Sequence, residues 1–190
     1  MKFYLLILLT LIIFSCKKDQ DCEIIYKQYI ELRMSSNDDK AFVELDKAIN
    51  CDTANIDYRF EKINYLISMR QYNDAKTELQ NLGKLDNSYV DKFPLLGLLK
   101  IKIGRKEEGI LDLKKVHNNL SKTENRDFNL NYYKLLLDVF FEGKSSVAFQ
   151  LQKQNFSTDD NEKAVIGYLK KLVNSDMDSL NILYKSFQIK

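Results

Sequence analysis

The side chains that could carry chemistry in this chain are few and far apart. A single histidine, His117, occurs among 190 residues, just before the polar stretch Asn118–Arg126. A histidine at the end of a helix is favourable for the helix dipole, so this position alone does not indicate catalysis. The sequence contains neither a Cys-x-x-Cys nor a His-x-x-x-His spacing, which are typical of zinc sites. We therefore expect no bound metal.

The paired carboxylates also have a structural explanation. Asp38-Asp39 and Asp159-Asp160 each precede a stretch with helical periodicity, where an aspartate can cap free backbone amides. The sequence has no glycine-rich phosphate loop and no nucleophile elbow. It therefore predicts neither an enzyme nor a cofactor, and it indicates no small-molecule substrate.

The N-terminal residues have the composition of an export signal. Lys2 precedes an apolar run, Phe3–Phe14, which only Thr10 interrupts, and charged residues begin at Lys17. As a helix this run would be roughly 18 Å long, which is too short for a bilayer core of about 30 Å. It fits a signal peptide instead, and we assign residues 1–15 to it.

The end of this segment, Ile13-Phe14-Ser15-Cys16, resembles the lipobox of bacterial lipoproteins. The resemblance implies that Cys16 carries diacylglycerol and acyl groups and becomes the first mature residue, with residues 16–21 as a tether. The alternative is an ordinary secretory signal with an incidental cysteine. Because Lys17 rather than aspartate follows Cys16, the resemblance favours the outer membrane of the cell envelope.

The two remaining cysteines are Cys22 and Cys51. In a helical hairpin the start of the first helix lies near the end of the second, so the expected fold brings these residues together. Outside the cytoplasm such a pair can form a disulfide. The alternative is that both are small buried side chains with free thiols.

Composition indicates a folded helical protein. Hydrophobic residues make up 45% of the chain and charged residues 29%, while six glycines and one proline leave little room for β-turns. The net charge of +2 does not suggest the concentrated basic face that nucleic acid binding requires. We expect an all-α protein that does not bind nucleic acid.

The strongest pattern is a repeat of 34 residues. Small residues recur at this interval, and a leucine follows each of them after four positions, giving the pairs Ala41 and Leu45, Ala75 and Leu79, and Gly109 and Leu113. A period of 34 residues is the length of one helix–turn–helix repeat. We predict units at about 22–54, 55–88, 89–120 and 127–156, followed by capping helices within 159–190.

These units resemble the tetratricopeptide repeat, in which large and small residues alternate so that paired helices pack closely. The third unit shows the pattern best, with its large, small and turn residues at Phe93, Leu96, Gly97, Gly104 and Gly109. The resemblance implies one continuous α-solenoid of antiparallel helix hairpins, a TPR-like superhelix that forms a single domain over 22–190.

Glycines and polar residues predict where helices end. Gly83 is expected to end a helix, because that position often needs a left-handed residue, and Gly104 and Gly143 are expected in turns. The stretch Asn118–Arg126 is expected to be a polar linker.

Capping motifs predict three helix starts. Each consists of a serine or aspartate followed three positions later by an acidic residue, a spacing that satisfies free backbone amides. The pairs are Ser121 with Glu124, Asp159 with Glu162, and Ser175 with Asp178.

The first helices of tetratricopeptide repeats line a groove that binds extended or helical peptides. Transferred to this chain, the resemblance places groove residues at Tyr26, Ile30, Arg33, Phe60, Asn64, Ile67, Leu98, Lys102, Tyr133, Leu137 and Phe141. Aromatic residues in this set suit protein recognition, because aromatics contribute strongly to interface energetics. Each of these residues can instead belong to the core.

The anchor and the repeats together suggest a function. We expect a membrane-anchored envelope lipoprotein that acts as a scaffold or adaptor for another envelope protein or peptide. An inhibitor or immunity-type lipoprotein that occludes one enzyme or toxin is the alternative. A small envelope hydrolase ranks third, since it would need convergent polar residues in a closed pocket.

Overall fold

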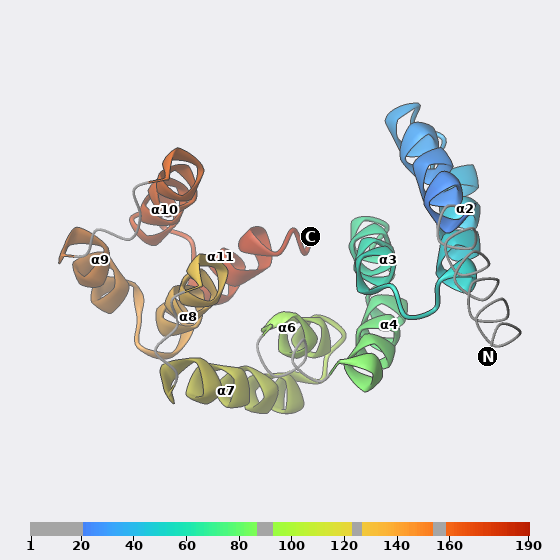
Figure 1. The fold of residues 1–190 in the computed structure, drawn as a ribbon. Coiled ribbons are helices and arrows are strands. Elements are labelled where there is room, and N and C mark those ends of the chain that lie inside the picture. The colour runs from blue at the N-terminus through green and yellow to red at the C-terminus, as the bar shows by residue number, and fades with distance from the viewer. Residues whose placement is uncertain (1–20, 87–92, 123–126, 154–158) are drawn as a thin grey trace, which may run out of the picture. The chain divides into compact units, whose positions relative to one another are not determined.

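The computed structural model describes residues 21–86, 93–122, 127–153 and 159–190 (Figure 1). Within these ranges every regular element is a helix, which confirms the predicted all-α class. The predicted signal peptide and the predicted lipidation site Cys16 lie outside the described residues. Among the described helices, none has both the length and the apolar character needed to span a bilayer.

The chain forms two compact units, Met1–Tyr65 and Leu66–Lys190, and each is described by itself. The division falls inside helix α3 (Ile56–Ser68). It therefore lies within the second predicted repeat, 55–88, rather than at the end of a repeat. Nothing in the sequence pattern suggests a division at this point.

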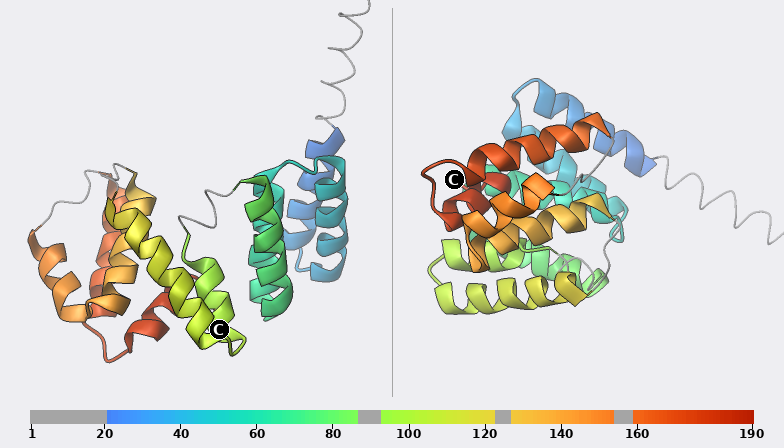
Figure 2. Two further views of the ribbon diagram at one scale, coloured as in Figure 1. Left: turned by 90° about the horizontal axis from the view of Figure 1, so that it is seen from below. Right: turned by 90° about the vertical axis from the view of Figure 1, so that its left-hand side faces the viewer.

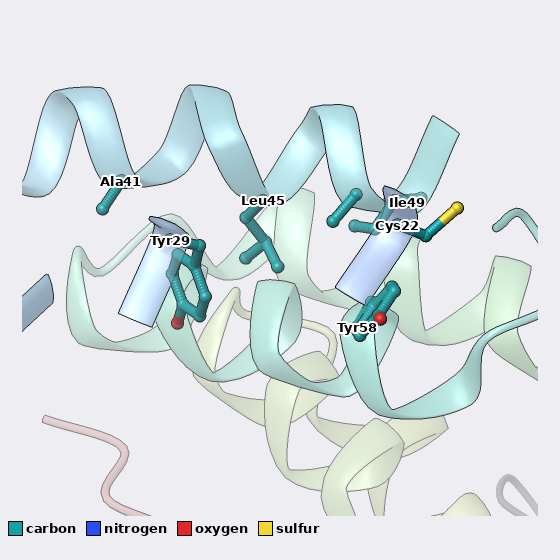
Figure 3. Close-up of a cluster of buried hydrophobic side chains, with 7 residues drawn as sticks. Cys22, Tyr29, Ala41, Leu45, Ile49 and Tyr58 are labelled. Carbon is teal, nitrogen blue, oxygen red and sulfur yellow. The ribbon is translucent and has the colours of Figure 1, made fainter. Parts of the chain in front are cut away.

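The first unit is built on a helix at 21–34, helix α2 (Asp38–Cys51) and the beginning of α3. Ala41, Leu45 and Ala48 lie on one face of α2 because they are separated by four and three positions, and all three are fully buried. They pack against side chains of the neighbouring helices, including Tyr29 and Tyr58 (Figure 3). This cluster is the core of the first unit.

The acidic pair at the start of α2 does not cap the helix as predicted. The N-cap is Asn37, whose side chain makes no capping bond, and Asp38 and Asp39 lie in the first turn. Acidic side chains in a first turn are favourable for the helix dipole. Their effect on α2 is therefore electrostatic.

The second unit continues beyond α3 with a succession of further helices. In chain order, those within the described residues are α4 (Tyr72–Leu85), α6 (Leu95–Lys102), α7 (Lys106–Lys122), α8 (Phe128–Phe141), α9 (Lys144–Lys153), α10 (Asp160–Val173) and α11 (Ser179–Ser186). From α6 to α10, each helix packs against the next, and α4 packs against α6. Helices α10 and α11 also contact α8, so α8 packs against α7, α9, α10 and α11 (Figure 2).

The residues of the 34-residue pattern all lie in the core. Ala41, Ala75, Leu45, Leu79 and Leu113 are each at most 1% exposed, and Gly109 is buried. A small residue at this position of each unit allows a neighbouring helix to approach closely. The contact between α6 and α7 is the clearest example, since a Cβ atom on Gly109 would lie 2.4 Å from the carbonyl oxygen of Gly97.

Two of the three predicted glycine positions are confirmed. Gly104 (φ 89°) and Gly143 (φ 96°) have the left-handed backbone of a tight turn. The prediction for Gly83 is wrong, because this glycine is buried inside α4, which continues to Leu85. The helix ends instead at the extended residue Asp86, whose amide donates to the carbonyl of Leu82, so no left-handed residue is needed.

The predicted linker is shorter than expected. Helix α7 continues to Lys122, and Leu120 is 2% exposed because it extends the buried face of Leu113 and Val116. Ser121 therefore lies within α7 and does not cap the following helix. Helix α8 is capped by Asp127, whose carboxylate accepts a hydrogen bond from the Leu130 amide at 3.1 Å.

The two C-terminal caps have different outcomes. The Asp159 carboxylate accepts from the amides of Asn161 and Glu162 at 2.9 and 3.0 Å, which confirms the predicted start of α10. Helix α11 is capped by Asp178, which accepts from the Asn181 amide, and not by Ser175. Ser175 instead donates its hydroxyl to the carbonyl of Leu172 at the end of α10.

Candidate functional site

A disulfide joins the two helices of the first hairpin. It connects Cys22, at the start of the helix at 21–34, to Cys51, the last residue of α2, with 5.5 Å between their Cα atoms. The turn that joins these helices, at Ser35 and Ser36, lies at the opposite end of the hairpin. The hairpin is therefore closed covalently at its open end.

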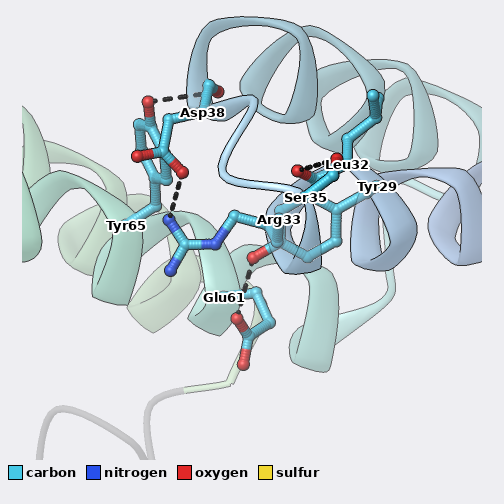
Figure 4. Close-up of polar contacts among 7 residues, drawn as sticks. All are labelled: Tyr29, Leu32, Arg33, Ser35, Asp38, Glu61 and Tyr65. Atoms are coloured by element: carbon cyan, nitrogen blue, oxygen red, sulfur yellow. Dashed lines mark hydrogen bonds and ion pairs between the residues drawn. The ribbon is translucent and has the colours of Figure 1, made fainter.

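One face of the helix at 21–34 carries three predicted groove residues. Tyr26 stacks on Tyr58 with 4.4 Å between ring centroids, and Ile30 is 37% exposed. The Arg33 guanidinium lies 3.4 Å from the Asp38 carboxylate and 5.3 Å from the Tyr65 ring centroid (Figure 4). Tyr26 and Arg33 are thus held by the first unit, while Ile30 extends toward solvent.

An exposed methionine that sequence reasoning missed adjoins Ile30. Met34 is one helical turn further along the same helix and is 82% exposed. We call Tyr26, Ile30, Arg33 and Met34 the first-helix surface. Two further predicted groove residues belong to α3, where Phe60 is half-buried and Asn64 is exposed.

A buried hydrogen bond holds the helix at 21–34, which carries the first-helix surface, against α3. The hydroxyl of Tyr29, which is 1% exposed, donates to a carboxylate oxygen of Glu61 at 3.0 Å (Figure 4). Burial, together with the negative charge of Glu61, raises the pKa of Tyr29 well above its usual range. Tyr29 therefore remains a neutral donor that ties the first helix to α3.

An open depression borders the same helix. It has a volume of about 320 Å³ and is lined by Gln28, Glu31, Leu32, Ser35 and Glu44. Most of these residues are polar, and the depression opens broadly to solvent. It does not have the closed, convergent form that the hydrolase hypothesis requires.

Three other predicted groove residues are core residues. Ile67, Leu98 and Leu137 are 4%, 0% and 0% exposed. Leu98 and Leu137 lie in apolar runs of α6 and α8, so the apolar face of each of these helices is wider than one stripe. Ile67 follows the fully buried Ile63 by one turn on the same face of α3. Their assignment to a binding groove is therefore wrong.

The C-terminal segment occupies two more of the predicted groove positions. The Lys102 ammonium lies 5.0 Å from the Tyr184 ring centroid and 5.7 Å from that of Tyr72. The Tyr133 ring stacks on Phe187 at 5.6 Å and also contacts Phe93 at 5.0 Å. Lys102 and Tyr133 thus bind part of their own chain.

The last predicted groove residue, Phe141, borders a buried polar cluster. Its ring stacks on the imidazole of His117 with 5.2 Å between centroids. His117 lies five positions before the end of α7, so it does not act at a helix terminus as predicted. Its Nε2 atom is 2.7 Å from Oδ1 of Asp138 on α8.

Asp138 is 0% exposed and has two charged or polar partners. Its Oδ1 faces His117, and its Oδ2 accepts from the Lys134 ammonium at 2.8 Å, one helical turn earlier. A histidine held by a buried aspartate can act as a base in nucleophilic catalysis, but that chemistry also needs an adjacent hydroxyl or thiol. In the part of the chain that the structure describes, the hydrogen-bonding partner of the His117 imidazole is the Asp138 carboxylate, which is neither a hydroxyl nor a thiol.

Glu142 completes a group of possible metal ligands. One ligand atom from each of His117, Asp138 and Glu142 lies within 4.8 Å of the other two. Asp138 and Glu142 are four positions apart on α8, which places them on one face, and His117 comes from α7. Sequence spacing did not reveal this group, because its ligands come from two helices.

The sequence nevertheless contains a pattern that indicates a buried polar contact for Asp138. It is the only charged residue in the run Leu135–Phe141, LLLDVFF. A charged residue within such a run is almost never fully buried without a partner. The run therefore implies a buried partner for Asp138, although it does not identify His117.

Comparisons with known proteins identify no relative of this chain. No protein-family model matches the chain, and neither the curated proteins nor the solved structures contain a significant match.

Proposed function

We propose that this chain is a lipoprotein of the bacterial cell envelope that is anchored through Cys16 and binds another envelope protein or peptide. The observation that carries the proposal is the exposed apolar pair Ile30 and Met34 on the helix at 21–34. The lipobox resemblance at Ile13–Cys16 supports the location, with the outer membrane favoured by Lys17.

We also propose that the helix hairpins stack as an α-solenoid resembling tetratricopeptide repeats. The buried 34-residue pattern and the close approach of Gly97 to Gly109 support this arrangement. The left-handed turn at Gly104 is a further point of similarity. A solenoid repeats one packing rule along the chain and is well suited to protein binding.

The first-helix surface has the chemistry of a protein-binding surface. Methionine is flexible and polarisable, so Met34 can adapt to different apolar partners. Tyrosine and arginine are enriched among residues that dominate binding energy, and both Tyr26 and Arg33 are already held in place by contacts in the first unit. Such ordering reduces the entropy lost on binding. We infer a partner that presents an apolar side chain to Ile30 and Met34.

Site-specific photo-crosslinking in the native host tests this surface. A photoreactive residue at position 30 should yield one specific crosslinked product. The matched control is position 43, because Val43 is 52% exposed but lies on α2. The proposal fails if position 30 gives no product, or if positions 30 and 43 give the same product.

Substitutions then test whether the side chains of Ile30 and Met34 contribute to binding. The double variant Ile30→Ser, Met34→Ser should lose the captured partner, because it removes the exposed apolar surface. Its helix content should not change, since both side chains extend toward solvent. If the partner proves to be a single enzyme or toxin whose activity falls on binding, the inhibitor hypothesis replaces the scaffold hypothesis.

The lipid anchor is tested separately. Cys16→Ser should release the protein from membranes and remove the mass of the lipid. Retention of the variant in the membrane fraction, with no lipid mass on the parent protein, would refute the anchor. The crosslinking result at position 30 would then decide the binding surface by itself.

A further inference from the structure

We propose that His117, Asp138 and Glu142 form a binding site for a divalent transition-metal ion, with Zn²⁺ as the reference ion. Imidazole and carboxylate groups are usual ligands of zinc in proteins. The three ligand atoms lie within 4.8 Å of one another. The inference does not depend on the proposed protein-binding function.

The geometry of His117 and Asp138 carries the proposal. Their ligand atoms, Nε2 and Oδ1, are 2.7 Å apart and face each other. In a tetrahedral zinc site with bonds of about 2.0–2.1 Å, neighbouring ligand atoms are about 3.3 Å apart. A separation of the two side chains by a few tenths of an ångström would therefore admit an ion in place of the shared proton.

Contacts around the two side chains already orient them as ligands. The stacking of His117 on Phe141 holds the imidazole plane, and the Lys134 ammonium binds Oδ2 of Asp138, which leaves Oδ1 directed at the histidine. Ligating carboxylates in metal sites are typically held in this way by outer hydrogen bonds. Asp138 is fully buried, so its position is also fixed by the surrounding core.

Glu142 supplies the third ligand from the surface. Its side chain is exposed and its carboxylate contacts the Ser146 hydroxyl at 3.2 Å, an interaction that is easily exchanged for an ion. With water in the fourth position, two carboxylates and one imidazole would complete a tetrahedral site. The exposed side of Glu142 provides the entry path.

Lys134 sets the expected strength of binding. Its ammonium group lies 2.8 Å from Oδ2 of Asp138, so its charge repels an ion bound at Oδ1. Replacing it by glutamine keeps a hydrogen-bond donor and removes the charge. Lys134→Gln should therefore bind Zn²⁺ more tightly than the parent protein.

Calorimetric titration of the full-length, chelator-treated protein with Zn²⁺ tests the site. We expect saturable binding of one ion per chain. His117 is the only histidine in the sequence, so its ring gives a single set of NMR signals, and these should shift with Zn²⁺ at the same stoichiometry. Glu142→Gln should weaken binding by at least about tenfold, because loss of even an outer-shell partner of a metal ligand has an effect of that size.

The matched control is Glu107→Gln, which changes an exposed glutamate of α7 away from the site. It should bind Zn²⁺ like the parent protein. Because Glu142 is exposed, its variant should unfold at the parent temperature without metal, which separates loss of a ligand from loss of folding. The proposal is overturned by the absence of one-to-one binding, by unchanged histidine signals, or by equal affinity in Glu142→Gln and the parent.

Discussion

Asp138 is a charged side chain placed wholly inside the second unit, between His117 and Lys134. A carboxylate loses its hydration on burial, and its two partners compensate for that loss. The pair of His117 and Asp138 is a polar contact that joins α7 to α8. Asp138 is also central to the inferred metal site, so its two roles need separate tests.

We predict that Asp138→Ala lowers the free energy of unfolding by about 3–5 kcal/mol, measured by urea denaturation without metal. Removing the carboxylate leaves the half-buried His117 and Lys134 without their partner and creates a cavity. The control is Asp160→Ala, whose side chain is 97% exposed and should cost less than about 1 kcal/mol. Similar losses in the two variants would show that the buried pair does not stabilise the fold.

At the scale of elements, the contact between α6 and α7 depends on two glycines. A Cβ atom on Gly109 would lie 2.4 Å from the Gly97 carbonyl oxygen and 2.9 Å from the backbone nitrogen of Ile101. Backbone atoms cannot move aside as the end of a flexible side chain can. The two helices approach closely because neither residue has a side chain.

We predict that Gly109→Ala destabilises the protein by about 1–3 kcal/mol, because overpacking outweighs the better helix propensity of alanine. Gly167→Ala is the matched control, since Gly167 lies inside α10 and a Cβ atom there would meet nothing within 4 Å. That variant should gain about 0.5–1 kcal/mol. Both variants are compared by urea denaturation. A change of stability in the same direction for both would contradict the close packing of α6 on α7 at Gly109.

Helix α11 is short, and its place in the second unit depends on a few side chains. Ile182 and Leu183 are both 0% exposed, and the helix packs against α8. The neighbouring contacts of Tyr184 with Lys102 and of Phe187 with Tyr133 hold the end of the chain over α6 and α8. This helix is therefore part of the core of the second unit.

We predict that Leu183→Ala costs about 2–5 kcal/mol of unfolding free energy, the range for removing a buried leucine side chain. Leu111→Ala is the control, because Leu111 is 66% exposed and should change stability by no more than about 0.5 kcal/mol. Thermal unfolding followed by circular dichroism distinguishes the two. A negligible loss at Leu183 would contradict the docking of α11.

At the scale of the whole molecule, the disulfide acts on the unfolded chain as well as on the first hairpin. Cys22 and Cys51 are 29 positions apart, so the crosslink restricts a loop of that length when the protein unfolds. In the chain-entropy model, a loop of this size corresponds to about 3–4 kcal/mol of stabilisation.

We predict that Cys22→Ser, Cys51→Ser loses about 2–4 kcal/mol of stability, measured by denaturation of the oxidised proteins. Cys16→Ser is the matched control, because it removes a cysteine and leaves the disulfide intact. A reducing agent should destabilise the parent protein and the control but have little effect on the double variant. If all three proteins were equally sensitive to reduction, the Cys22–Cys51 disulfide would not be the source of the lost stability.

Much of the fold could be predicted because helix formation is governed by neighbours along the chain. Periodicity placed Leu45, Leu79 and Leu113 in the core, and the turns at Gly104 and Gly143 followed from the special backbone freedom of glycine. Where a helix end was predicted wrongly, the reason is packing against other helices. Burial of Leu120 extended α7 through a polar sequence that by itself indicates a linker.

The sequence by itself determined the helical class, the 34-residue core pattern and the main turns, since these depend on contacts within a few turns of helix. Only the tertiary structure decided the surroundings of His117, because its partner Asp138 is 21 positions away on another helix. It also decided that Lys102 and Tyr133 bind the C-terminal segment. Side chains on one helix do not specify which distant helix covers them, so these contacts depend on how the whole unit packs.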